Sequence, residues 1–218
     1  MEIPANAEEA KKIQLKLRNR VQIVPLKKTP EFIAGVDAAF SGGKVVAAAC
    51  LFTYPEHILI EDAYATADIT IPYIPGLLSF REGPATMNAI NKLNKKPDVI
   101  LFDGQGIAHP LGMGIAAHIG VLLKIPSVGC AKSRLIGDYV EPGKRKGQNT
   151  ILKYQGKIIG SAVRTRDNVK PLFVSPGHLI DLRGSINVVL NCIGKYRIPE
   201  PLRRADFLSK ELKKSIKL

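Results

Sequence analysis

Three apolar runs follow one another near the start of the chain, and short polar turns separate them. They cover residues 32–40, 44–54 and 58–67, and the first turn is Ser-Gly-Gly at 41–43. Strand-like runs joined by turns of this length are typical of an antiparallel meander. The chain is therefore expected to begin its sheet with three consecutive antiparallel strands.

After residue 70 the pattern changes, and helical and strand-like segments alternate. Short, fully apolar runs such as 99–102 and 127–131 are typical of parallel strands that are covered on both faces. The other expected elements are helices at 7–21, 79–93, 112–124, 181–192 and 200–214, a hairpin over 150–163 and a strand at 172–174. This order predicts a single α/β domain over residues 1–218, with a mixed sheet of an antiparallel meander and then parallel strands, flanked by helices.

The charge of the chain indicates a polyanionic partner. The 32 Lys and Arg residues exceed the 19 Asp and Glu residues, which gives a formal net charge of +13. Residues 144–170 alone carry eight basic residues against one acid, Asp167. A nucleic acid is the first candidate partner and an acidic membrane surface is the second. The 45% of hydrophobic residues is enough for a core and excludes wholesale disorder.

The cysteines and the apolar runs indicate the cellular compartment of the protein. Cys50, Cys130 and Cys192 are far apart and odd in number, so they form neither a disulfide framework nor a Cys-x-x-Cys zinc site. No apolar run approaches the length of about 18 residues that a membrane span requires, and the acidic start has no apolar signal core. A reduced, cytoplasmic protein that does not enter a membrane is expected.

Two acids stand where the pattern expects apolar residues. Asp37 lies inside the strand-like run 33–40, and Asp103 directly follows the run 99–102. A buried carboxylate needs a cation or a basic partner, and two carboxylates at one sheet edge repel unless a divalent ion lies between them. Oxygen ligands favour Mg²⁺ or Mn²⁺ over zinc. The alternative is that each is a turn cap or half of an ion pair.

Further candidates surround these two acids. Glu82, in the first turn of a predicted helix, is either a third metal ligand or an acid that stabilises the helix dipole. Lys132 follows another apolar strand, where it binds phosphate or stays solvated. His109 ends a glycine-rich loop, 103–110, and a place near the phosphate is expected for it. The loop is not a dinucleotide fingerprint, because His109 stands where the third glycine is required.

Several blocks of the sequence resemble the endonuclease V family, the deoxyinosine 3′-endonucleases of DNA repair. They are Gly-Val-Asp (35–37), Pro-Tyr-Ile-Pro-Gly-Leu-Leu-Ser-Phe-Arg-Glu (72–82), Asp-Gly-Gln-Gly-Ile-Ala-His-Pro (103–110), Gly-Cys-Ala-Lys-Ser (129–133), Ser-Pro-Gly-His (175–178) and Arg-Ile-Pro-Glu-Pro-Leu-Arg-Arg-Ala-Asp (197–206). The resemblance implies an RNase H-like fold. It also implies Mg²⁺-dependent hydrolysis of the second phosphodiester bond 3′ to deoxyinosine, with Mn²⁺ as a substitute, leaving 3′-hydroxyl and 5′-phosphate ends.

The resemblance also assigns roles to residues. It implies that Asp37, Asp103 and Glu82 bind metal, and that Lys132, His109 and Asp206 belong to the catalytic group. Tyr73 matches the wedge that fills the gap left by a flipped base, and a ring held between two prolines is rigid enough for it. The other expected DNA-binding residues are Pro72, Ile74, Gly76, Leu78, Arg81, Gly104 and Gly106.

The pocket motifs leave the type of nucleic acid open. Backbone groups around Gly76 and Gly104 are expected to read the O6 acceptor and N1–H donor of hypoxanthine, a pattern that adenine reverses. Two departures from the family pattern are Leu111-Gly112, where basic residues are expected, and Gln105, where His is common. Double- or single-stranded DNA with deoxyinosine is the expected partner of a monomer. The alternatives are inosine-containing RNA, or a non-catalytic nucleic-acid-binding protein.

Overall fold

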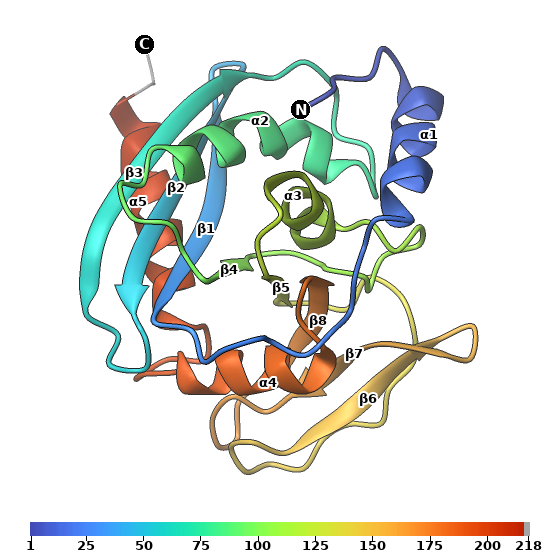
Figure 1. The fold of residues 1–218 in the computed structure, drawn as a ribbon, viewed down its shortest axis with the longest axis vertical. Helices are drawn as coiled ribbons and strands as arrows, with labels where there is room; N and C mark the ends of the chain where they lie inside the picture. The colour runs from blue at the N-terminus through green and yellow to red at the C-terminus, as the bar shows by residue number, and fades with distance from the viewer. Residues whose placement is uncertain (216–218) are drawn as a thin grey trace.

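The computed structural model describes residues 1–215 as one eight-stranded sheet with helices on both faces (Figure 1). The strands are β1 (Phe32–Ser41), β2 (Lys44–Thr53), β3 (Leu59–Asp68), β4 (Val99–Phe102), β5 (Ser127–Ala131), β6 (Asn149–Tyr154), β7 (Lys157–Val163) and β8 (Leu172–His178). The helices are α1 (Ala7–Arg18), α2 (Leu78–Asn91), α3 (Ile115–Leu123), α4 (Leu182–Asn191) and α5 (Glu200–Ser215). The strand order across the sheet is β3-β2-β1-β4-β5-β8-β7-β6.

The directions of the strands confirm the expected fold class. Strands β1, β2 and β3 form the antiparallel meander, and β4 and β5 extend it in parallel from β1. Strands β8, β7 and β6 then continue the sheet in antiparallel order. The result is the mixed sheet that the pattern of apolar runs predicts, in the RNase H-like arrangement that the family resemblance implies.

Both faces of the central strands are buried, which explains why β4 is apolar at every position. Ile100 and Phe102 point into the core on the side of α2 and α3. Val99 and Leu101 point into the core on the side of α4 and α5. Since successive side chains of a strand point to opposite faces, a strand covered on both sides needs an unbroken apolar run.

Several element boundaries differ from the predicted ones, and backbone geometry explains one of them. Helix α3 begins at Ile115 rather than at Gly112, because Gly112 has a φ of +67°, in the left-handed region. Strand β8 runs four residues beyond Val174 and ends at His178. Proline and glycine in Ser-Pro-Gly-His argue against a strand, but Val128 pairs with Pro176 next to a register shift in β5.

Helix α5 crosses the face of β1 at very short range, and Gly35 makes this approach feasible. A Cβ atom at Gly35 would lie 2.1 Å from the carbonyl carbon of Pro201 and 2.5 Å from the nitrogen of Leu202. These are backbone atoms, so they cannot move aside as a flexible side chain could. The absence of a side chain at this position therefore fixes how close the start of α5 lies to the sheet.

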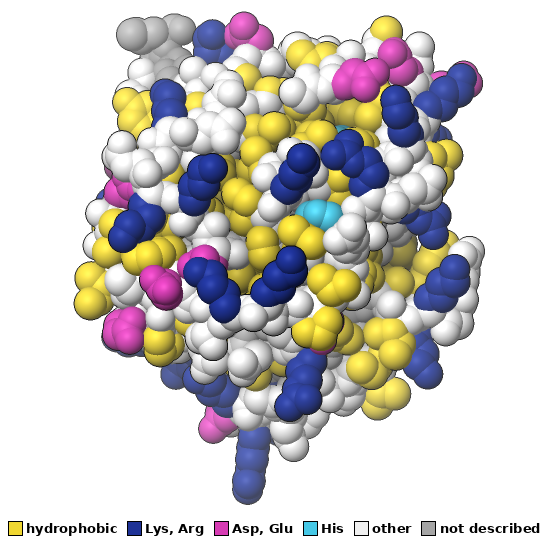
Figure 2. Space-filling model, viewed as in Figure 1, with side chains coloured by type: hydrophobic (Ala, Val, Ile, Leu, Met, Phe, Trp, Pro, Cys, Tyr) yellow, Lys and Arg dark blue, Asp and Glu magenta, His cyan; other side chains and the backbone are white. Residues whose placement is uncertain are grey.

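The surface agrees with the charge of the sequence. Figure 2 shows Lys and Arg side chains spread widely over one face of the molecule, with acidic side chains less frequent among them. None of the helices in the described part of the chain is long and apolar enough to cross a bilayer.

We expect Gly35→Ala to destabilise the fold by about 3 kcal/mol, since its methyl group would overlap the backbone of α5. Gly43→Ala is the matched control, because Gly43 has a φ of +77° but no atom within 4 Å of the position that a methyl group would take. Its cost is expected to be about 1 kcal/mol from backbone strain alone. Urea unfolding of both variants measures the difference, and equal losses would contradict the close approach.

Candidate active site

Two carboxylates lie side by side on neighbouring parallel strands. Val36 of β1 pairs with Phe102 of β4, so the next residue of each chain segment, Asp37 and Asp103, occupies the same level of the sheet. The N–H group of Asp103 donates to the carbonyl oxygen of Val36 at 3.4 Å, which continues the ladder by one step. The parallel pairing of β1 with β4 therefore brings together two acids that are far apart in the sequence.

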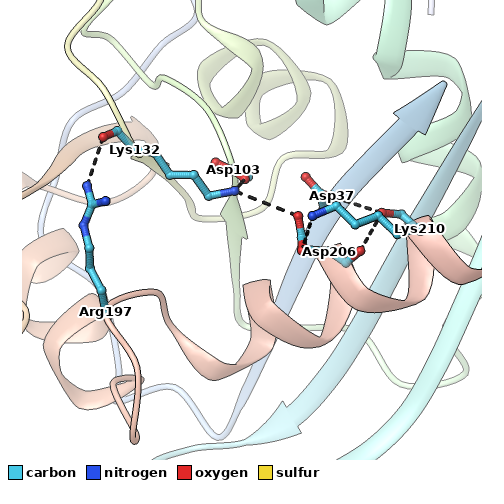
Figure 3. Close-up of polar contacts among 7 residues, drawn as sticks. Asp37, Asp103, Lys132, Arg197, Asp206 and Lys210 are labelled. Carbon is cyan, nitrogen blue, oxygen red and sulfur yellow. Dashed lines mark hydrogen bonds and ion pairs between the residues drawn. The ribbon is translucent and has the colours of Figure 1, made fainter.

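Helix α5 adds a third carboxylate, that of Asp206 (Figure 3). One carboxylate oxygen from each of Asp37, Asp103 and Asp206 can be chosen so that all three lie within 4.8 Å of one another. The hydroxyl group of Ser209, one helical turn after Asp206, donates to Asp37 Oδ2 at 3.0 Å. The close packing of α5 on β1 thus positions both the third acid and a hydrogen-bond donor for the first.

Two lysines contact this group of three carboxylates. The Nζ atom of Lys132, which directly follows β5, forms an ion pair with Asp103 and lies 3.9 Å from Asp206. Lys210 Nζ lies 2.7 Å from Oδ2 of Asp206, the carboxylate oxygen that Lys132 does not approach. Arg197 Nη2 donates to the backbone carbonyl of Lys132 at 2.9 Å, which ties the segment before α5 to the end of β5 (Figure 3).

The lysines leave part of the negative charge uncompensated. Burial, together with the charges of Asp103 and Asp206, raises the pKa of Asp37 to about 6. Burial, together with the charges of Asp37 and Asp103, raises the pKa of Glu82 to about 8. Acids with raised pKa values that face one another fit a divalent cation, which would favour their charged forms. Because all the donors are oxygens, Mg²⁺ and Mn²⁺ suit the group best.

Glu82 of α2 lies near the group but is not one of its three members. It lines a narrow crevice together with Asp37 and Asp103, and its pKa responds to both of them. The structure therefore places all four expected acids in one region. The three whose oxygens converge are Asp37, Asp103 and Asp206, and the role of Glu82 as a metal ligand beside Asp37 and Asp103 stays a prediction.

A pocket of about 370 Å³ adjoins the carboxylates, and Asp103 and its ion-pair partner Lys132 line it. Five further predicted residues line it: Tyr73, Gly76, Leu78, Gly104 and His109. Lining residues that the sequence did not single out are Pro75, Ser79, Met113, Gly114, Ile115, Ala131, Ser133, Arg134 and Leu135, together with Gln105, to which no role was given. The volume is in the range of small-molecule sites in proteins.

Four residues expected at the DNA-binding surface do not line this pocket. Gly106 serves packing instead, because a Cβ there would lie 2.1 Å from the carbonyl oxygen of Pro176 and its N–H donates to Ser175 Oγ at 2.8 Å. The guanidinium group of Arg81 stacks on the ring of Phe40, 4.5 Å from its centroid. The other two are Pro72, which is exposed, and Ile74, which packs against the core cluster around Ile71 and Leu77.

His109 is engaged on both ring nitrogens. Its Nε2–H donates to the carbonyl oxygen of Gly76 at 2.9 Å, and its Nδ1 accepts from the N–H of Leu111 at 3.2 Å. The side chain is 6% exposed, and burial lowers its pKa, so the neutral ring is favoured. In this arrangement His109 holds the wall of the pocket and has no ring nitrogen left for a phosphate.

The two departures from the family pattern also have structural consequences. A Cβ at Gly112 would lie 3.5 Å from Arg18 Nε, so a cation from α1 covers the loop where basic residues were expected. The Nε2 atom of Gln105 donates to the carbonyl oxygen of Ser133 at 3.1 Å, across the floor of the pocket.

Several supporting residues were not expected from the sequence. Ser209 could have been found from its spacing, since it lies three positions after Asp206 on a helix and so shares its face. Arg197 is the first residue of one of the family blocks, but it is neither an acid nor a nucleophile, so its type did not indicate a role. Its contact with Lys132 depends on a separation of 65 residues that only the fold closes.

A family model, a relative in sequence and a relative in structure all carry the same description. The family model described as Endonuclease V matches residues 15–207. An Endonuclease V of Dictyoglomus turgidum is 48% identical over 205 residues, which are 94% of this chain and 90% of that protein. A solved Endonuclease V of Streptomyces avermitilis is 39% identical with a TM-score of 0.93, covering 97% of this chain and 95% of that one.

A further solved structure shows a nucleic acid bound to a similar protein. It is Endonuclease V of Ciona intestinalis in complex with a 24mer DNA containing an inosine followed by a ribo-adenosine. It is 27% identical, with a TM-score of 0.85, and the match covers 96% of this chain and 98% of that one. The converging carboxylates, the adjoining pocket and these matches agree, and the chain belongs to the endonuclease V family of DNA-repair nucleases.

Proposed function

We propose that this protein recognises deoxyinosine in DNA and hydrolyses the second phosphodiester bond on its 3′ side, with Mg²⁺, leaving 3′-hydroxyl and 5′-phosphate ends. The observation that carries the proposal is that Asp103, a member of the three-carboxylate group, and Lys132, its ion-pair partner, both line the pocket. A base held in the pocket would bring the strand beside it to the carboxylates. Recognition and cleavage would then occur on one strand in one encounter.

Asp37, Asp103 and Glu82, which line one crevice, would hold the divalent ion, and the carboxylate of Asp206 would complete the site. When bound, the ion would supply positive charge to the phosphate and lower the pKa of an attacking water. Ser209 would keep Asp37 oriented through its hydroxyl group. Lys132, beside Asp103, would add a second positive charge where the phosphate passes. Mn²⁺ would substitute, because it accepts the same oxygen ligands.

The pocket would receive the base after it has turned out of the helix. Tyr73 is 66% exposed at the rim of the pocket, so its ring is available to fill the gap in the stack. His109 would act as a positioning residue for the pocket wall rather than as an acid or base. An inosine pair is weaker than a normal pair, which lowers the cost of turning the base out.

Inosine in RNA is the second candidate substrate. The Ciona protein was crystallised with a ribonucleotide directly after the inosine, so the strand next to the lesion accepted a 2′-hydroxyl group in that relative. We further propose that the protein acts as a monomer and a single domain, since one chain supplies every residue of the site. The cytoplasm is the proposed compartment, because all three cysteines are buried and free.

We expect the wild-type protein to nick a deoxyinosine duplex only when Mg²⁺ is present, and to leave the matching adenine duplex intact. Asp103→Asn should lower the nicking rate about 100-fold or more, because it removes a charge that would hold the ion. Asp68→Asn is the control, since that acid is exposed on the edge strand and pairs with Lys44 alone. Stronger nicking of an inosine RNA of the same sequence would overturn the DNA assignment in favour of the second candidate.

The raised pKa values predict how pH changes stability without metal. Between the unfolded pKa near 4 and the folded values of about 6 for Asp37 and 8 for Glu82, the folded protein binds more protons than the unfolded chain. The free energy of unfolding should therefore fall as pH rises from about 4 to 8. Added Mg²⁺ should raise the melting temperature more at pH 8 than at pH 5.5, because the ligands must be deprotonated. An equal rise in the melting temperature with Mg²⁺ at both pH values would contradict deprotonated carboxylates as the ligands.

Tyr73→Ala should weaken binding to deoxyinosine DNA about tenfold, since stacking on an aromatic ring contributes about 1–3 kcal/mol per base. The melting temperature should not change, because the ring is largely exposed. Tyr73→Phe keeps the ring and should bind within about twofold of wild type. Fluorescence anisotropy with a labelled duplex measures both variants, and an unchanged affinity of Tyr73→Ala would exclude the wedge role.

A further inference from the structure

A fully buried glutamine connects the first helix to the pocket. Gln14 of α1 is 0% exposed, in the same stripe as the apolar residues Ala10, Ile13 and Leu17 that dock the helix. Its Nε2 donates to the carbonyl oxygens of Gly76 at 2.9 Å and Met113 at 3.2 Å. Both acceptors belong to residues that line the pocket, and they come from two segments that are separate in the sequence. Helix α1 therefore ties these two pocket-lining segments together.

The orientation of this amide is determined by its partners. Carbonyl oxygens only accept hydrogen bonds, so the NH₂ end of Gln14 must face Gly76 and Met113. Its Oε1 then lies buried, with no hydrogen-bond partner among the described residues. An unpaired buried oxygen destabilises a protein, and the two hydrogen bonds of Nε2 offset this loss. What glutamine contributes at this position is therefore its hold on the two carbonyl groups.

The bonds to Gly76 decide which of its polar groups is available. Its carbonyl oxygen accepts from both Gln14 Nε2 and His109 Nε2, each at 2.9 Å. Its N–H has no hydrogen-bond partner in residues 1–215. The backbone has a φ of +85° here, a conformation that a glycine adopts without strain and can also leave easily. Gly76 lines the pocket, and with its carbonyl held by two donors its unpaired backbone group is a donor and not an acceptor.

We propose that Gln14 is a positioning residue that sets the base specificity of the pocket. By holding the carbonyl of Gly76 away, it leaves a backbone donor for the O6 acceptor of hypoxanthine. Adenine has an amino group at this position, so it would bring a donor against a donor and be rejected. Without the amide of Gln14 the Gly76 carbonyl has one donor fewer and can turn to accept from adenine. This inference rests on the proposed recognition of inosine.

The test replaces Gln14 by Met, which keeps the volume and removes both donors. The Asp37→Asn background prevents cleavage, and anisotropy measures affinity for two duplexes that differ only in inosine against adenine. We expect the inosine-to-adenine preference to fall about tenfold, which corresponds to about 1.4 kcal/mol. The melting temperature should fall, because the buried carbonyl of Met113 loses its hydrogen-bond donor. Ile13→Val, a change at the neighbouring buried position of α1, should lower the melting temperature and leave the preference unchanged.

The possible outcomes distinguish a failure of the proposed function from a failure of the role of Gln14. If the Asp37→Asn protein with Gln14 intact shows no preference for inosine, the proposed function fails and this inference fails with it. If that protein prefers inosine and Gln14→Met keeps the full preference, the role of Gln14 is overturned while the proposed function stands. If Ile13→Val lowers the preference as much as Gln14→Met does, the effect comes from loosened packing of α1, and the specific role of the amide is overturned.

Discussion

Repulsion between carboxylates at one end of the sheet is the constraint on which the rest of the site depends. Parallel pairing of β1 with β4 forces Asp37 and Asp103 to the same level, and α5 adds Asp206. The hydroxyl group of Ser209 and the charge of Lys132 do not offset this, since burial, together with the charges of Asp103 and Asp206, keeps the pKa of Asp37 raised to about 6. An arrangement of this kind is a preformed site for a hard cation, because a bound ion would relieve the repulsion that the fold imposes.

The position of α5 is as important to the site as the acids themselves. Gly35 lets the start of the helix lie directly on the backbone of β1, and the same helix carries Asp206 and Ser209 at its next turns. A larger residue at position 35 would displace the third carboxylate together with the helix. The geometry of the site therefore depends on the close backbone contact at Gly35, two residues before Asp37. No catalytic group takes part in this contact.

The pocket and the carboxylates form one continuous working surface. Asp103 and Lys132 belong to both, and the walls of the pocket are fixed from outside by buried polar groups rather than by apolar packing alone. His109 illustrates this difference in role. It lies where the sequence suggested, in the glycine-rich loop beside the acids, but its two nitrogens are used to hold the backbone of neighbouring segments. Proximity to the site thus does not imply a part in proton transfer.

The sequence alone determined the fold class, the two central acids and the loop that carries Tyr73. Each of these depends on local signals: apolar periodicity, an acid where a strand should be apolar, and a ring between two prolines. Only the tertiary structure decided that Asp206 joins Asp37 and Asp103 in the converging group, that Gly106 packs against β8, and that Gln14 bonds to residues that line the pocket. These contacts join residues that are far apart in the sequence, such as Gln14 and Gly76 at 62 positions, or depend on the exact distance between backbones. Residue type and spacing do not encode such distances, because they are set by how α1 and α5 pack on the rest of the chain.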